Sequence, residues 1–116
     1  MDASGFALPP GTLLGNYKLL KALGQGGFGI TYIAWDSQLR RNIVLKECFP
    51  LGLCSRVSDT GEIIPLPHTS RQAYRTAMDS LRKEAQTLAS LNHERIVRVY
   101  DVFESHGSIF YVMPWL

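Results

Sequence analysis

Residues 24–29 read Gly-Gln-Gly-Gly-Phe-Gly, and residues 30–35 continue as Ile-Thr-Tyr-Ile-Ala-Trp. The second run is rich in β-branched and aromatic residues and predicts a strand, as does the segment from Tyr17 to Leu23 before the glycines. Four glycines in six residues are more than a tight turn needs, since each glycine lowers the stability of a strand. The stretch therefore predicts a hairpin whose backbone can approach a ligand closely.

The glycine spacing by itself is compatible with several classes of protein. Glycines at 24, 26 and 29 match a dinucleotide-binding fingerprint, but that fingerprint opens a helix, and here the last glycine opens a strand. The phosphate loop of many nucleoside triphosphatases ends in Gly-Lys-Ser or Gly-Lys-Thr, and no lysine follows these glycines directly. A purely structural turn remains the alternative interpretation.

The remaining apolar runs predict an antiparallel sheet. Residues 42–48 form a third strand, which a short polar turn connects to the second. Residues 96–103 and 108–113 form two more strands, joined by a tight turn at 104–107. Short connections between successive strands indicate antiparallel pairing. With one long helix between the third and fourth strands, the sequence predicts an α+β fold built on a five-stranded antiparallel sheet.

The helix is predicted over residues 70–91. Thr69 and Gln72 fit a capping box at its start, and apolar residues recur along it at helical spacing. Glu84 projects from this apolar stripe, where a buried carboxylate needs a cation from the facing element. Lys46, at the end of the third strand, is the natural candidate for that cation. The alternative is that Lys46 ends its strand in solvent and that Glu84 flanks the edge of the stripe as a surface charge.

Two segments lie outside this framework. Residues 1–15 are rich in glycine and proline and predict a flexible leader, with order beginning near Asn16. Residues 49–68 are predicted to be an insertion between the third strand and the helix, with a small hairpin at the turn Asp59-Thr60-Gly61.

Composition and charge limit the function classes. The chain has 116 residues, 46% of them hydrophobic, and a formal net charge of +2, which describes one soluble globular domain. Its basic residues are scattered, so no nucleic-acid partner is expected. The longest apolar stretch is too short to span a membrane and the N-terminus lacks the basic start of a secretory signal, so the sequence predicts a cytoplasmic protein. Cys48 and Cys54 lack a metal-ligand spacing; we expect reduced thiols and no metal site, with a disulfide between them as the alternative.

Taken in order, these features resemble the N-terminal lobe of a protein kinase: a glycine hairpin, a strand ending in Lys46, a helix carrying Glu84, and a strand running into Val-Met-Pro-Trp-Leu at 112–116. The run Lys-Glu-Cys-Phe-Pro at 46–50 is most similar to bacterial serine/threonine kinases of the eukaryotic type. The resemblance covers residues 16–116. It implies an incomplete kinase domain that ends at the hinge between the two lobes.

The resemblance implies a role for each matching residue. Lys46 would hold the α- and β-phosphates of ATP and accept an ion pair from Glu84, which makes these two the candidate catalytic residues. Met113 would be the gatekeeper, while the Pro114 carbonyl and the Leu116 amide would bind the adenine ring. The residues implied to contact ATP are Leu23, Gly24, Gln25, Gly26, Gly27, Phe28, Gly29, Thr31, Val44, Lys46, Met113, Pro114 and Leu116. The accompanying Mg²⁺ would be bound mainly by the other lobe.

The chain departs from the family pattern at three points: two positions that contact the adenine ring, the turn after the helix, where His93-Glu94-Arg95 replaces the usual His-Pro-Asn, and the motifs of the other lobe. Val44 stands where alanine is usual and Thr31 where valine is usual, both at positions that contact the adenine ring, and this leaves nucleotide affinity open. The 116 residues contain no His-Arg-Asp catalytic loop and no Asp-Phe-Gly metal motif. This chain alone is therefore not expected to transfer phosphate.

The leading hypothesis is the ATP-binding lobe of a serine/threonine protein kinase, which transfers phosphate from ATP to a protein serine or threonine only in the complete enzyme. Its implied partners are ATP, the C-terminal kinase lobe and a protein substrate. The rival is a non-catalytic, pseudokinase-like interaction module, and the third alternative is an unrelated α+β fold with an incidental glycine turn. A lobe cut at the hinge would leave Phe110, Val112 and Trp115 without cover, so self-association as a homodimer is also predicted.

Overall fold

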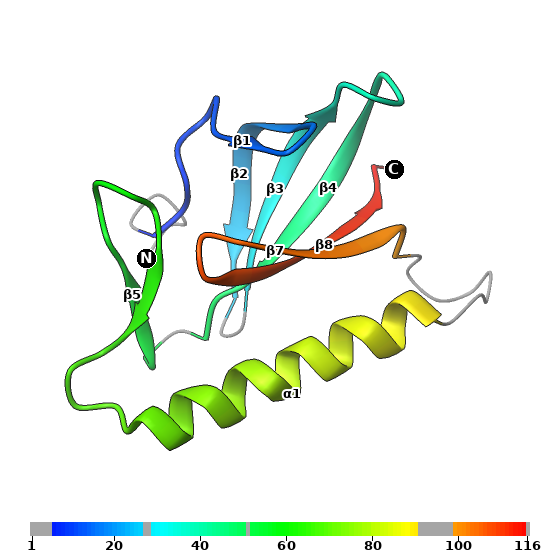
Figure 1. The fold of residues 1–116 in the computed structure, drawn as a ribbon. Coiled ribbons are helices and arrows are strands. Elements are labelled where there is room, and N and C mark those ends of the chain that lie inside the picture. Colours follow the sequence, from blue (N-terminus) through cyan, green and yellow to red (C-terminus); the bar gives the residue numbers. More distant parts are fainter. Residues whose placement is uncertain (1–5, 27–28, 51, 91–98, 116) are drawn as a thin grey trace.

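The structure, a computed structural model, describes residues 6–26, 29–50, 52–90 and 99–115. These residues form a six-stranded antiparallel sheet in the order β1-β2-β3-β4-β8-β7, a separate two-stranded hairpin β5-β6, and one long helix, α1, that runs beneath the sheet in the view of Figure 1. The elements are β1 (Leu13–Leu14), β2 (Tyr17–Gln25), β3 (Gly29–Asp36), β4 (Arg41–Cys48), β5 (Cys54–Arg56), β6 (Ile63–Pro65), α1 (Arg71–Ser90), β7 (Asp101–Ser105) and β8 (Ser108–Pro114).

The five predicted strands are present as β2, β3, β4, β7 and β8, but the sheet has a sixth strand, β1. This strand is only two residues long and pairs with the start of β2, Leu13 with Lys18 and Leu14 with Tyr17. Gly15 allows the tight return between them because its φ is +63°. The strand predicted over 96–103 is observed from Asp101 onward, and residues 96–98 lie outside the described residues.

The segment expected to be a flexible leader contributes to the core where the structure describes it. Leu8 is 4% exposed and Leu14 is 3% exposed, and the Leu8 amide donates a hydrogen bond of 3.0 Å to the Tyr32 hydroxyl. Order therefore begins before Asn16, earlier than the sequence predicts. The glycines and prolines of this segment form turns, as expected. The segment is nevertheless ordered because the apolar side chains between these turns are buried against the sheet.

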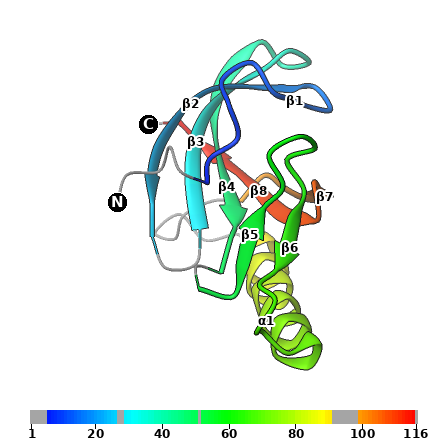
Figure 2. The same ribbon diagram turned by 90° about the vertical axis from the view of Figure 1, so that its left-hand side faces the viewer.

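The two faces of the sheet differ in character because side chains alternate along each strand. Tyr32, Leu45 and Val112 lie opposite one another on β3, β4 and β8, and all three are buried. On this face the ring of Phe103 stacks between those of Tyr17, at 5.6 Å, and Phe110, at 5.2 Å. Since Tyr17 belongs to β2 and Phe103 to β7, the sheet curls until its two ends meet around the core, as Figures 1 and 2 show.

Helix α1 packs its apolar stripe, including the buried Met78 and Ala85, below β7 and β8. Its N-cap is Ser70, whose Oγ accepts a hydrogen bond of 3.0 Å from the Ala73 amide, and the predicted Thr69–Gln72 capping box is therefore shifted by one residue. Thr69 instead donates its own amide to the Leu66 carbonyl in the preceding turn. The predicted helix end near residue 91 lies at the limit of the described residues.

The insertion contains the predicted hairpin. Strands β5 and β6 are joined through the Asp59-Thr60-Gly61 turn, where Gly61 has a φ of +75° and the Val57 amide bonds the Glu62 carbonyl. Cys48 and Cys54 are both buried free thiols.

Candidate functional site

Four of the residues implied to contact ATP share the outer face of the sheet, opposite the core. Strand pairing sets Thr31 beside Lys46, and Val44 beside Met113. All four side chains are half-buried, in contrast to the fully buried residues that alternate with them. The alternation inferred from sequence, with Val44 and Lys46 on one face, is therefore confirmed.

The glycine hairpin lies at the Lys46 end of this face. The Gly26 amide bonds the Gly29 carbonyl at 2.9 Å and closes the turn. A Cβ atom at Gly29 would lie 2.8 Å from Cε of Lys46 and 2.9 Å from the Glu47 carbonyl oxygen, so only glycine fits where the lysine chain crosses the strand. At Gly24 and Gly26 a Cβ would meet no atom within 4 Å, which shows that neither glycine is required by packing within the described residues. The hairpin therefore presents open backbone beside a lysine.

The other predicted site residues of this region are placed as follows. Gln25 ends β2 and pairs with Ile30, while Leu23, 46% exposed, lies at an irregularity of β2 between Ala22 and Gly24. Pro114 ends β8 opposite Ile43. Gly27, Phe28 and Leu116 lie outside the described residues.

Lys46 and Glu84 both line a small cavity between the sheet and α1. The cavity has a volume of about 160 Å³ and is lined by Lys46, Cys48, Leu81, Glu84 and Tyr111. The two charged groups do not come within the 4.0 Å of an ion pair, although both belong to the described residues. Glu84 is exposed, so the expectation of a buried carboxylate is wrong; it lies at the edge of the stripe, whereas Lys46 is half-buried within β4 and does not end its strand in solvent. The physical reason is that Ala85, its neighbour, occupies the line of closest packing at 1% exposure.

Burial disfavours ionisation of the Cys48 thiol and the Tyr111 hydroxyl, which also line this cavity. Burial raises the pKa of the Cys48 thiol to about 12, and the nearby Lys46 charge only partly offsets this. Burial also raises the pKa of Tyr111 to about 12, with further contributions from Cys48 and Glu84. Both groups therefore stay protonated at physiological pH.

The strand leading to the hinge is more deeply packed than the sequence suggests. Phe110 and Val112 are fully buried within this chain, whereas Trp115 is 47% exposed. The predicted self-association was argued from these three side chains, and two of them are already covered, because the curled sheet closes over its own inner face.

Sequence reasoning missed a second carboxylate, Glu47, which is fully buried. Its oxygens accept hydrogen bonds from Tyr32, Arg56 and Ser108. A signal for it existed: Glu47 follows Lys46 directly, so strand alternation places it on the buried face with Leu45.

Within the described ranges, no helix has the length and apolar character needed to cross a bilayer. The same residues hold no group of three or more His, Cys, Asp or Glu side chains arranged to bind a metal ion.

Comparisons with known proteins agree on one family. The chain is 30% identical over 104 residues to the serine/threonine-protein kinase PknA of Nostoc, covering 86% of this chain and 16% of the relative. It is 34% identical over 112 residues to RqkA, a DNA damage-responsive serine/threonine-protein kinase of Deinococcus radiodurans, covering 94% of this chain and 14% of the relative. The chain thus spans about one-sixth or less of these relatives. No protein-family model matches it.

Solved structures give the same answer for the fold. The apo form of PpkA-294 matches 95% of this chain with a TM-score of 0.83 and 30% identity, and the match spans 39% of that structure. The Mycobacterium tuberculosis PknI kinase domain matches with a TM-score of 0.62 at 20% identity, which supports the fold alone. The sheet order, the helix and these similarities together show that the chain belongs to the bacterial serine/threonine protein kinases and corresponds to the N-terminal lobe of their kinase domain.

Proposed function

We propose that this chain binds ATP and acts, in the complete protein, as the nucleotide-binding lobe of a kinase that phosphorylates protein serine or threonine. The observation that carries the proposal is the contact between Lys46 and the glycine hairpin, where the lysine chain crosses Gly29 too closely for any Cβ. A lysine held beside a glycine-rich hairpin whose backbone a ligand can approach closely is the arrangement that binds nucleotide phosphates in kinases.

The residues present fit such a ligand. Lys46 would bind phosphate oxygens, and the unobstructed backbone at Gly24 and Gly26 would cover the phosphate chain. Thr31, Val44 and Met113 would receive the adenine ring, because they are half-buried on the same open face. ATP supplies the phosphoryl group, with Mg²⁺ bound mainly by residues of the C-terminal lobe.

Glu84 is proposed to pair with Lys46 in the nucleotide-bound kinase. Both side chains already line the 160 Å³ cavity, so a small shift of α1 toward the sheet brings them together. The ion pair with Glu84 would hold the Lys46 ammonium group in position to bind the phosphates of ATP.

Isothermal titration of Mg-ATP into the complete protein tests the proposal. Lys46→Met is expected to weaken binding by about tenfold or more, because it removes a charge-assisted contact. Lys18→Met is the control, since Lys18 is also a strand lysine but is exposed and pairs with Trp35, far from the hairpin. Equal affinity in wild type and Lys46→Met, or no binding to wild type, contradicts the proposal and favours the non-catalytic interaction module.

A further inference from the structure

The buried carboxylate of Glu47 is the centre of a polar network that joins four strands, β3, β4, β5 and β8. One oxygen accepts hydrogen bonds from the Tyr32 hydroxyl at 2.8 Å and from Nη2 of Arg56 at 2.6 Å. The other accepts a hydrogen bond from Oγ of Ser108 at 2.7 Å. Glu47 on β4 is thereby tied to β3, to the inserted hairpin and to β8.

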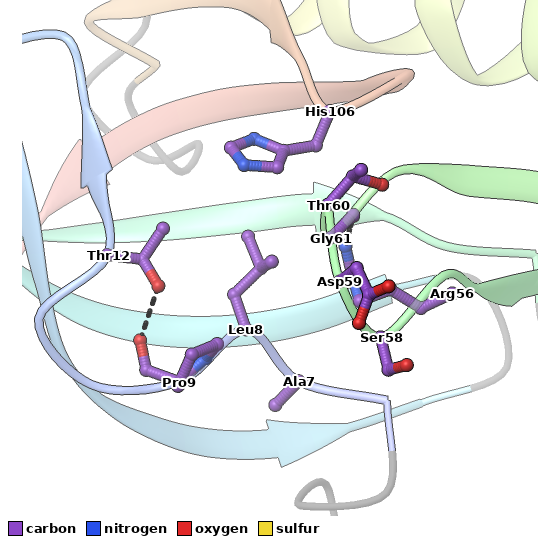
Figure 3. A pocket seen from close by; sticks show the side chains of 10 residues that line it. All are labelled: Ala7, Leu8, Pro9, Thr12, Arg56, Ser58, Asp59, Thr60, Gly61 and His106. Carbon is purple, nitrogen blue, oxygen red and sulfur yellow. Dashed lines mark hydrogen bonds between the residues drawn. The ribbon is translucent and has the colours of Figure 1, made fainter.

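Among the residues that the structure describes, Arg56, from β5 of the insertion, is the one charged donor to this carboxylate, and its side chain is only 8% exposed. Its other two nitrogens also donate: Nε to the Phe6 carbonyl at 2.6 Å and Nη1 to the Gly61 carbonyl at 2.7 Å. Arg56 forms part of the wall of a pocket of about 390 Å³ between the N-terminal segment and the tip of the inserted hairpin (Figure 3). The insertion therefore places the cation of Arg56 in the core, and the hydrogen bond from Arg56 to Phe6 holds the N-terminal segment against it.

The charge of Arg56 is needed where it lies. A fully buried carboxylate without a cation is strongly unfavourable, and breaking such a pair leaves the remaining charge uncompensated. Hydrogen bonds from two neutral hydroxyl groups, those of Tyr32 and Ser108, do not neutralise it.

This network lies directly behind the proposed phosphate site. Glu47 follows Lys46, and its carbonyl oxygen would be 2.9 Å from a Cβ at Gly29, so the backbone of β4 is tightly packed against the glycine hairpin there. A shift of the Glu47 side chain out of the core would move the same stretch of backbone that carries Lys46.

We propose that Arg56 is a positioning residue for Lys46: its charge keeps Glu47 seated in the core, so that β4 holds the lysine against Gly29. The inserted hairpin is thereby the element that supplies the countercharge for the proposed nucleotide site. The nucleotide part of the inference rests on the proposed function, whereas the effect on β4 does not.

The test compares Arg56→Gln with the double variant Glu47→Gln/Arg56→Gln in the complete protein. Arg56→Gln is expected to weaken Mg-ATP binding by about tenfold or more, because it leaves the buried Glu47 carboxylate, next to Lys46, without its cationic partner. The double variant is expected to bind within about threefold of wild type, because a neutral side chain at 47 no longer needs the cation and keeps its hydroxyl partners. If the double variant is as weak as Arg56→Gln, the role of Arg56 lies in its bonds to Phe6 and Gly61, and the inference is overturned.

A second variant covers the case in which Arg56→Gln does not fold. Arg56→Lys keeps the charge but cannot make all three contacts, and it is expected to retain Mg-ATP affinity within about threefold. A loss by Arg56→Lys as large as that expected for Arg56→Gln overturns the inference. Arg82→Gln is the control, because Arg82 also pairs with carboxylates, those of Asp79 and Glu104, but all three side chains are accessible to solvent.

Amide hydrogen exchange without nucleotide separates this inference from the proposed function. Arg56→Gln is expected to raise exchange in the peptide spanning residues 43–48, and the double variant to restore it. If wild type does not bind Mg-ATP but exchange follows this pattern, the proposed function fails and the positioning of β4 stands. Unchanged exchange in Arg56→Gln overturns the inference whether or not ATP binds.

Discussion

Lys46 and Glu84 line the same 160 Å³ cavity without forming an ion pair. Glu84 is exposed to solvent on α1, while Lys46 lies along Gly29 on the sheet. A carboxylate that remains hydrated contributes little to the stability of the fold. The carboxylate that lies in the core is that of Glu47, the residue after Lys46. Two neighbouring positions of β4 therefore have different roles: Lys46 is proposed to bind phosphate, and Glu47 is a buried structural charge.

Glu84→Gln is expected to change the free energy of unfolding by less than about 0.5 kcal/mol, because an exposed, unpaired carboxylate has little to lose. Urea unfolding followed by circular dichroism measures this. Glu47→Gln, at a buried site with three hydrogen-bond donors, is the contrasting variant and should destabilise clearly. A large loss for Glu84→Gln would contradict the unpaired arrangement.

Gly29→Ala is expected to destabilise the chain by about 1–3 kcal/mol, since its Cβ would overlap Cε of Lys46 and the Glu47 carbonyl. Gly26→Ala is the control in the same hairpin, because a Cβ there meets nothing within 4 Å. Urea midpoints of the two variants give the comparison. Equal effects of the two substitutions would argue against the tight crossing at Gly29.

Ser70→Ala is expected to lower stability by about 1 kcal/mol through loss of the helix N-cap. Thr69→Ala should be close to neutral, because no hydrogen bond to α1 is made by its side chain in the described structure. Thermal unfolding of the two variants measures both losses. A larger loss for Thr69→Ala than for Ser70→Ala would instead support the capping box predicted from sequence.

Cys48 and Cys54 are expected to resist alkylation in the folded chain. Burial raises the pKa of Cys48 to about 12 and that of Cys54 to about 11, so few thiolates form at pH 8. Mass spectrometry after iodoacetamide treatment should find both thiols unmodified without urea and modified with it. Rapid labelling of either thiol in the native chain would contradict its burial.

Stability is expected to fall as the pH rises from about 9 to about 12. The thiols of Cys48 and Cys54 and the hydroxyl of Tyr111 have raised pKa values in the folded chain, so the unfolded chain releases these protons first. Each group then contributes at most about 1.4 kcal/mol of loss per pH unit between its unfolded and folded pKa. Urea unfolding across this range measures the slope, and Tyr111→Phe should reduce it above pH 10.

Local patterns predicted the parts of the fold that depend on local chemistry. The β-branched runs predicted the five longer strands, which the structure contains. The predicted turn at 104–107 is also present, and its residues His106 and Gly107 both have a positive φ. Alternation likewise placed Val44 and Lys46 on one face.

Features that depend on distant partners were not predictable in the same way. Strand β1 and the burial of Leu8 require a sheet already formed beneath them. The exposure of Glu84 follows from a rotation of α1 that periodicity defines only coarsely. The Arg56–Glu47 pair joins the inserted hairpin to β4, and sequence spacing alone does not bring these two side chains together.

The strand order has a consequence for how the protein is made. Strand β8, the last in the chain, pairs with β4 in the interior of the sheet, between β4 and β7. As the nascent chain emerges, β4 therefore presents an unpaired edge until residues 108–114 leave the ribosome, and such edges invite pairing with other chains. Completion of the sheet in this lobe therefore waits until residues 108–114 are available to pair with β4.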